Sequence, residues 1–171
     1  MVENIDLLMS LETNNSVLDL ACGSGRNGRL LVQKGIPVTF ADRDKTQLDQ
    51  LAVELMNASV QTEIWQVDFE LPDGEPLADK CFDSILVFNY LHRPLLPAIR
   101  AAIRPGGLIF YETFTFAQTA FGRPNNPDYL LQAGELQTIF NDWQILHKFE
   151  GELQQPRCAV ANLIARRPET G

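Results

Sequence analysis

The chain has no apolar run long enough to cross a bilayer and no paired cysteines. Its longest uninterrupted apolar runs are of the kind Ile85–Phe88, whereas a transmembrane helix needs about 20 apolar residues. Cys22, Cys81 and Cys158 are scattered and odd in number, so neither a disulfide framework nor a zinc site is indicated, and no metal is expected. Residues 1–6 carry acids in place of the basic patch of a secretory signal. These absences predict a cytoplasmic protein with no membrane span.

Basic residues are in the minority. The 171 residues include 14 Lys and Arg against 22 Asp and Glu, which gives a net charge of −8. Proteins that grip phosphate backbones or anionic membranes do so largely with clustered basic residues. A small molecule is therefore the expected partner and nucleic acid is not, while an oligomer stays open. No repeat, low-complexity tract or linker marks a boundary, so residues 1–171 are expected to form a single domain.

Short β-branched apolar runs alternate with segments of helical spacing, which is typical of βαβ units and predicts an α/β fold. The predicted strands are 16–21, 37–41, 60–67, 82–88 and 108–111, and the predicted helices are 5–11, 30–34, 48–56, 95–103 and 134–140. The run 82–88 is too continuously apolar for a one-sided strand, so we expect it at the centre of a sheet covered on both faces. Two final runs, 143–149 and 159–165, have no helix between them and are expected to close the sheet as an antiparallel hairpin.

A long irregular stretch follows the fifth predicted strand. Residues 113–128 are rich in Phe, Pro and Asn. Loops of this length are usually functional or disordered, and the aromatic residues favour packing. We therefore expect a lid over the substrate at residues 113–131.

A glycine-rich turn joins the predicted strand 16–21 to the predicted helix 30–34. Residues 23–28 have the spacing G-x-G-x-x-G. Gly23 and Gly25 let main-chain N–H groups approach a nucleotide-type ligand with no Cβ in the way. An acid about 20 residues later is expected to bind ribose hydroxyls, and Asp42 fills that position. The turn alone does not separate NAD from other adenosine-bearing cofactors.

Two further acids favour a cationic cofactor. Asp19 lies inside the first strand, where a carboxylate sits badly beneath a pyrophosphate but well beside a positive charge. S-adenosylmethionine carries two such charges, an ammonium and a sulfonium. Asp68 is placed to accept from an adenine amino group, while the ring of Phe69 packs on the purine. We therefore expect S-adenosylmethionine as the cofactor.

Together these residues resemble the class I S-adenosylmethionine-dependent methyltransferases. The resemblance covers 17–166 and rests on five motifs in order, 17–25, 41–44, 67–69, 82–89 and 104–108. It implies a Rossmann-like, doubly wound α/β sheet of seven mostly parallel strands, with an antiparallel C-terminal strand and helices on both faces. Residues 121–136 and 143–146 are similar to the small bacterial methyltransferases of the tellurite-resistance type. Little chain precedes the first motif, so we expect a more open site than in many relatives, or one covered by a partner chain.

The residues after the fourth strand are the candidates for chemistry. Asn89, Tyr90 and His92 follow its carboxyl end, where ligands of open α/β sheets bind. His92 or Tyr90 is the candidate catalytic base if the acceptor is a hydroxyl or an ammonium, whereas a thiolate needs no base. The expected cofactor-binding residues are Asp19, Gly23, Gly25, Asp42, Arg43, Asp68, Phe69 and Asn89.

The sequence thus predicts methyl transfer from S-adenosylmethionine to a small-molecule acceptor by in-line displacement. Because the cofactor supplies the activation, the protein has mainly to align donor and acceptor and to exclude water. Two alternatives stay open. One is a nicotinamide-dependent oxidoreductase, which the glycine turn and Asp42 would also suit. The other is an S-adenosylmethionine-binding protein without catalysis.

Overall fold

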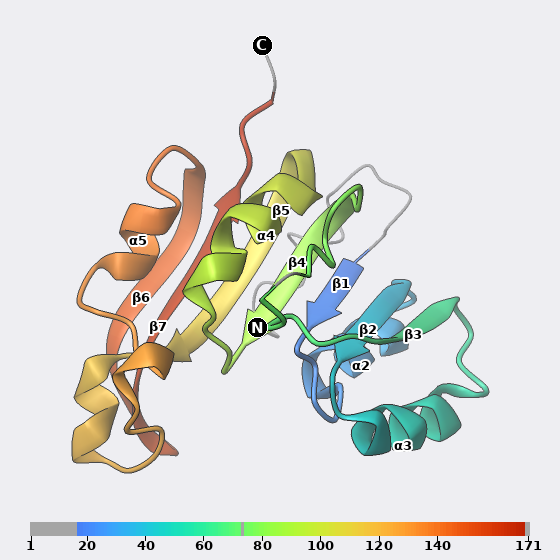
Figure 1. The fold of residues 1–171 in the computed structure, drawn as a ribbon, viewed down its shortest axis with the longest axis horizontal. Helices are drawn as coiled ribbons and strands as arrows, with labels where there is room; N and C mark the ends of the chain where they lie inside the picture. Colours follow the sequence, from blue (N-terminus) through green and yellow to red (C-terminus); the bar gives the residue numbers. More distant parts are fainter. Residues whose placement is uncertain (1–16, 73, 170–171) are drawn as a thin grey trace.

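The computed structural model describes residues 17–72 and 74–169, so the predicted helix at 5–11 lies outside the described residues. One seven-stranded sheet runs through the molecule in the order β3-β2-β1-β4-β5-β7-β6 (Figure 1). The strands are β1 (Val17–Leu20), β2 (Val38–Asp42), β3 (Thr62–Gln66), β4 (Phe82–Phe88), β5 (Ile103–Phe114), β6 (Gln144–Gln154) and β7 (Arg157–Arg166). The α-helices are α2 (Arg26–Gln33), α3 (Lys45–Leu55), α4 (Leu96–Ala102) and α5 (Glu135–Ile139). Three short 3₁₀ helices are η2 (Arg93–Leu95), η3 (Phe116–Ala120) and η4 (Pro127–Tyr129).

The strand directions confirm the predicted fold class. The β1–β2, β2–β3, β1–β4 and β4–β5 pairs are parallel, and β7 is antiparallel to both β5 and β6. This is a Rossmann-like sheet with an antiparallel C-terminal strand. β4 has the predicted bounds and the central place, with three strands on either side. Its residues 82–87 are all buried, as a strand covered on both faces requires.

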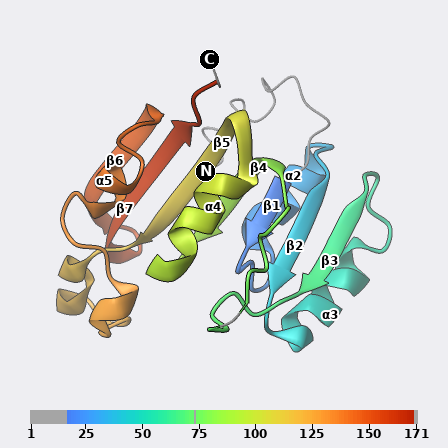
Figure 2. The ribbon, with the colours of Figure 1, turned by 45° about the horizontal axis from the view of Figure 1, so that its top comes forward.

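Helices cover both faces of the sheet, as predicted (Figure 2). Leu18 and Leu20 of β1 belong to the core cluster that includes residues of α4 and α5. Val17 belongs to the other cluster, with residues of α2 and α3. Because side chains alternate along a strand, Asp19 points to the same side as Val17, toward α2. The face that a β1 residue occupies therefore decides which helix it meets.

The preceding helix ends at Ala102, one residue before the predicted Ile103, and residues 105–107 interrupt the pairing within β5 instead of separating a helix from a strand. β5 begins at Ile103 and runs through the glycines, with a register shift opposite residues 82–84. Gly107 makes this passage possible, because a Cβ there would lie 2.7 Å from the Asp83 carbonyl oxygen. The Gly106 N–H donates to the Arg167 carbonyl and the Arg167 N–H to the Gly107 carbonyl, at 3.0 and 2.9 Å. A distant segment thus holds this irregular part of β5, in which Gly106 has a φ of 74° and residues 104–107 have no register partner on β4.

The irregular stretch also begins later than predicted, because Thr113 and Phe114 pair with β7 as part of β5. Beyond them, Gln118 accepts the Ala159 N–H at 2.9 Å. The Arg157 guanidinium lies 4.8 Å from the centroid of the Phe121 ring. These contacts anchor the segment to β7, while its role as a substrate lid stays a prediction.

None of the helices within the described residues is long and apolar enough to span a membrane. In the same residues no group of three or more His, Cys, Asp or Glu side chains is arranged to hold a metal ion.

Candidate cofactor and acceptor site

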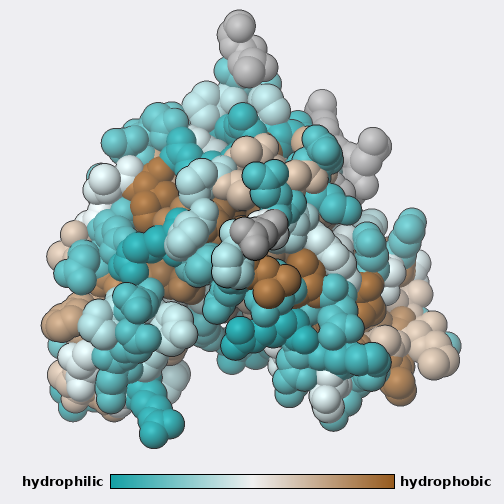
Figure 3. Space-filling model, in the orientation of Figure 1, coloured by the Kyte–Doolittle hydropathy of each residue, from teal (hydrophilic) through white to brown (hydrophobic). Residues whose placement is uncertain are grey.

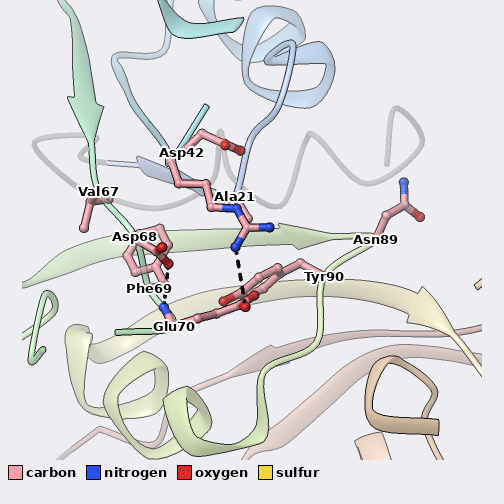
Figure 4. Close-up of a pocket in the computed structure, with 9 residues that line it drawn as sticks. Ala21, Asp42, Val67, Asp68, Phe69, Glu70, Asn89 and Tyr90 are labelled. Carbon is pink, nitrogen blue, oxygen red and sulfur yellow. Dashed lines mark hydrogen bonds and ion pairs between the residues drawn. The ribbon is translucent and has the colours of Figure 1, made fainter. Parts of the chain in front are cut away.

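A cavity of about 220 Å³ lies at the carboxyl ends of the parallel strands β1 to β4 (Figure 4). Parallel strands end at the same edge of a sheet, so residues far apart in the sequence meet there. The lining residues are Ala21, Asp42, Arg43, Val67, Asp68, Phe69, Glu70, Asn89 and Tyr90. Six residues predicted for the site are therefore brought together here, namely Asp42, Arg43, Asp68, Phe69, Asn89 and Tyr90.

Two carboxylates hold the glycine-rich turn. The Gly23 N–H donates to Asp42 Oδ2 at 2.7 Å, and the Gly28 N–H donates to Asp19 Oδ2 at 2.8 Å. Gly23 and Gly25 have φ values of 53° and 67°, a left-handed conformation that glycine adopts most easily. The turn is thus fixed near both ends by side chains from β1 and β2.

Asp19 is the most unusual ionisable group near the turn. Its side chain lies beneath the turn, is only 2% exposed and does not line the cavity. Burial raises the pKa of Asp19 from 3.8 to about 7, the Gly28 N–H opposes this rise, and the charge of Asp42 adds to it. Within the described residues, neither carboxylate forms an ion pair with Lys or Arg. Two acidic side chains without an ion-pair partner in this part of the chain therefore lie against the turn.

The wall at the end of β3 combines an aromatic ring with carboxylates. Asp68 Oδ1 accepts the Glu70 N–H at 2.9 Å, which fixes the direction of the chain after Asp68. The Phe69 ring is largely buried and packs edge-on against Trp65. Glu70 forms an ion pair with Arg43, with 3.6 Å between Arg43 Nη1 and Glu70 Oε2. Glu70 was missed by the sequence analysis, although its position two residues after Asp68 could have indicated it.

Tyr90 brings a buried hydroxyl to the cavity. Its oxygen makes no well-formed hydrogen bond within the described residues, although the Glu70 carboxylate lies close enough to interact with it. Burial, together with the negative charges of Glu70 and Asp68, raises the pKa of Tyr90, so the phenol stays protonated at neutral pH. A buried hydroxyl without a well-formed hydrogen bond is costly. A polar ligand atom in the cavity would supply a well-placed partner.

His92 does not line this cavity. It lies just before η2 and lines a larger hollow of about 1160 Å³ between residues 69–80 and the segment from η2 to α4. The hollow shares only Phe69 and Glu70 with the cavity. Figure 3 shows apolar patches among hydrophilic residues on the face of the molecule that carries α4. The structure thus separates His92 from Tyr90, although the two are neighbours in the sequence.

The family model for a methyltransferase domain matches residues 17–107. This range is more than half of the chain and contains every residue that lines the cavity. The chain belongs to this methyltransferase family. The protein is accordingly a class I methyltransferase, an enzyme whose cofactor is S-adenosylmethionine. The nicotinamide-dependent alternative therefore loses its basis, because it rested only on features that the two classes share.

Several solved structures share the fold of this chain. TehB from Haemophilus influenzae superposes with a TM-score of 0.75 at 21% identity, covering 98% of this chain and 62% of that chain. A methyltransferase from Methanosarcina mazei superposes with a TM-score of 0.72 at 14% identity, covering 96% of this chain and 98% of that chain. The N-methyltransferase NodS from Bradyrhizobium japonicum superposes with a TM-score of 0.71 at 14% identity, covering 98% of this chain and 94% of that chain. At these identities the likeness shows the shared fold. No curated protein matches the chain.

The residues at this edge fit S-adenosylmethionine. The cavity offers an apolar wall, two strand-end carboxylates and the buried Tyr90 hydroxyl, which makes no well-formed hydrogen bond within the described residues. Two carboxylates, Asp42 and Asp19, hold the turn beside it, and neither forms an ion pair with Lys or Arg within the described residues. A ligand with a purine, a ribose and a cationic end satisfies each of these features.

Proposed function

We propose that the protein transfers a methyl group from S-adenosylmethionine to a small-molecule acceptor. The observation that carries the proposal is the pair of carboxylates at the glycine turn, Asp19 and Asp42, which accept main-chain N–H groups and form no ion pair within the described residues. An anionic cofactor such as NAD would meet repulsion at this turn, whereas a cationic cofactor is attracted to it.

Each part of the cofactor has a proposed partner. Asp42 receives the ribose hydroxyls, since its carboxylate lines the cavity at the end of β2. Asp68 accepts from the adenine amino group while Phe69 and Arg43 flank the purine. Asn89 follows β4 beside the cavity and contacts the amino-acid end.

The glycine turn serves the same end of the cofactor. Gly23 and Gly25 offer main-chain N–H groups without a Cβ to obstruct the approach. Asp19 acts from beneath the turn, through its charge and its hold on Gly28. When bound, the cofactor supplies an activated methyl group, so the chain's own work is to orient the acceptor and exclude water.

A small acceptor is favoured over a nucleic acid by the charge of the chain. The net charge is −8, and the cavity itself presents Asp42, Asp68 and Glu70. Tyr90 is the better placed of the two candidate catalytic residues, because its hydroxyl lies at the cavity, whereas His92 faces the neighbouring hollow. Since the pKa of Tyr90 is raised, its proposed role is to orient the acceptor as a hydrogen-bond donor.

Calorimetry with S-adenosylhomocysteine and with NAD tests the cofactor assignment. We expect binding of S-adenosylhomocysteine only, and Asp42→Ala should weaken it by about 1–3 kcal/mol through the loss of a charged hydrogen-bond partner. Glu63→Gln is the matched control, because Glu63 is an acid of the neighbouring strand β3 that lies outside the cavity. Binding of NAD alone would overturn the proposal.

Formation of S-adenosylhomocysteine with a panel of acceptors tests turnover. Tyr90→Phe is expected to reduce turnover, and His92→Ala is expected to leave it largely intact. If His92→Ala abolishes turnover while S-adenosylhomocysteine still binds, the preference for Tyr90 is wrong. Tight cofactor binding with no turnover on any acceptor class would contradict catalysis on small molecules.

A further inference from the structure

A polar pair lies on the sheet next to the cofactor cavity but outside it. Glu112 of β5 and Asn162 of β7 are direct partners in the strand register. Asn162 Nδ2 donates to Glu112 Oε2 at 3.1 Å. Both residues are half-buried. Burial of a carboxylate and an amide on a sheet face costs free energy that apolar side chains would avoid, so the pair calls for an explanation.

The hydrogen bonding of the pair is incomplete in a specific way. A carboxylate only accepts hydrogen bonds, so Asn162 must turn its NH₂ group toward Glu112 and its oxygen away. That oxygen, Asn162 Oδ1, is buried and has no hydrogen-bond partner among the described residues. Within residues 17–72 and 74–169, no Lys or Arg forms an ion pair with Glu112. The pair therefore presents acceptors, one of them charged, and lacks a donor.

Aromatic residues flank the pair on the same face. Phe88 is the register partner of Glu112 on β4, and Phe149 is the register partner of Asn162 on β6. Register partners point their side chains to the same side of a sheet, so the four residues form one row across β4, β5, β7 and β6. Phe149 is 37% exposed, so the row is not sealed from solvent. Aromatic faces beside a carboxylate favour an organic cation.

The row lies close to the cofactor edge. The Asn89 N–H donates to the Glu112 carbonyl at 2.9 Å, and Asn89 lines the cofactor cavity. Phe88 packs against the core cluster that contains residues of α2, so the row shares its face with the helix that follows the glycine turn. His92 lines a hollow formed with α4, whose buried residues belong to the cluster on the other face.

We propose that Glu112 and Asn162 bind an amino group of the methyl acceptor, which makes the acceptor an amine with an apolar body. This inference rests on the proposed function and specifies its substrate class. The amine N–H groups donate to Glu112 and to Asn162 Oδ1, and Phe88 and Phe149 pack against the carbon skeleton. Thiols and carboxylates do not satisfy two acceptors and are disfavoured at this site.

Three probes with one carbon skeleton test the inference, namely phenethylamine, 2-phenylethanethiol and hydrocinnamate. ¹⁵N-labelled protein saturated with S-adenosylhomocysteine is titrated with each, and the side-chain NH₂ signals of Asn162 are followed by NMR. We expect phenethylamine to shift these signals in a saturable manner and the other two probes to leave them unchanged. Equal shifts with all three probes, or no shift with the amine, would overturn the inference.

Glu112→Gln provides a second test, because the amide oxygen of Gln still accepts from Asn162 Nδ2 and only the charge is lost. We expect phenethylamine to bind roughly tenfold more weakly or worse, as for loss of a charged hydrogen-bond partner, with S-adenosylhomocysteine affinity unchanged. Glu63→Gln is the matched control, since Glu63 Oε2 likewise accepts from a side chain on a neighbouring strand, Thr39 Oγ1, at 3.2 Å. Unchanged affinity for phenethylamine in Glu112→Gln would contradict this inference alone. Failure of the wild type to bind S-adenosylhomocysteine would contradict the proposed function.

Discussion

Replacing Asp19 by Asn removes a buried charge and keeps an oxygen that accepts the Gly28 N–H. Burial raises the pKa of Asp19 from 3.8 to about 7. Since each pKa unit corresponds to 1.36 kcal/mol, the charged carboxylate costs on the order of 4 kcal/mol of folding free energy above neutral pH. Asn resembles the protonated acid, so Asp19→Asn is expected to stabilise the cofactor-free protein at pH 8 by up to about this amount.

The sign of the pH dependence follows from linkage. The folded state holds the Asp19 proton more tightly than the unfolded state, so this group's contribution to stability is complete below pH 3.8 and is lost as the pH rises toward about 7. Urea unfolding of wild type and variant from about pH 4 to pH 8 measures this contribution. Plotted against pH, the free energies of unfolding of the two proteins should diverge as the pH rises and run parallel above about pH 7. Parallel curves over the whole range would refute the reasoning. Calorimetry should show weaker binding of the cationic cofactor by Asp19→Asn.

Three further changes test other parts of the structure. Gly28→Ala places a Cβ 2.3 Å from a ring carbon of Phe40, so the free energy of unfolding in urea should fall by about 1–3 kcal/mol. Glu135→Gln removes the charged partner of Arg93, whose Nε lies 2.7 Å from Glu135 Oε1. Arg93 lowers the pKa of Glu135, so the variant should lose about 1 kcal/mol of stability at neutral pH, discounted for partial exposure. This difference should shrink as the pH falls below the ordinary Glu pKa and disappear only below the lowered pKa of the folded state. Arg157→Gln removes the cation beside an aromatic ring in the segment 115–131, and hydrogen exchange in that segment should accelerate while global stability changes by about 1 kcal/mol or less.

The fold could be predicted because its signals are local. The continuous apolar run of β4 and the glycine turn after β1 each depend on residues close in the sequence, and both predictions were confirmed. Residues 105–107 interrupt regular pairing as predicted, but they lie within β5 because Arg167, 60 positions away along the chain, holds them with main-chain hydrogen bonds. Proline and glycine disfavour a strand locally, but two main-chain hydrogen bonds from a distant segment outweigh that preference.

The site could be predicted where a residue ends a parallel strand. Asp42, Asp68 and Asn89 follow this rule, and all three line the cavity. Residue pairs that meet only because two strands are aligned in the sheet cannot be predicted in this way. Glu112 and Asn162 are 50 positions apart, and nothing in either local sequence shows that they are partners. The sequence also gave no reason to separate His92 from Tyr90, because the helical turn that begins at η2 decides which hollow each residue faces.

The two carboxylates at the glycine turn show why stability and ligand binding oppose each other here. Asp19 accepts the Gly28 N–H with one oxygen, whereas Asp42 accepts the N–H groups of Gly23 and Asp44 with its two oxygens. An uncharged acceptor would serve Gly28 as well as Asp19 does. Hydrogen bonding alone therefore does not explain the almost completely buried carboxylate of Asp19 so close to the charge of Asp42. A cationic ligand does explain this arrangement, because its binding offsets the repulsion and the desolvation that the free protein bears. On this reasoning the cofactor should stabilise the wild-type protein more than it stabilises Asp19→Asn, and the difference should grow with pH up to about 7.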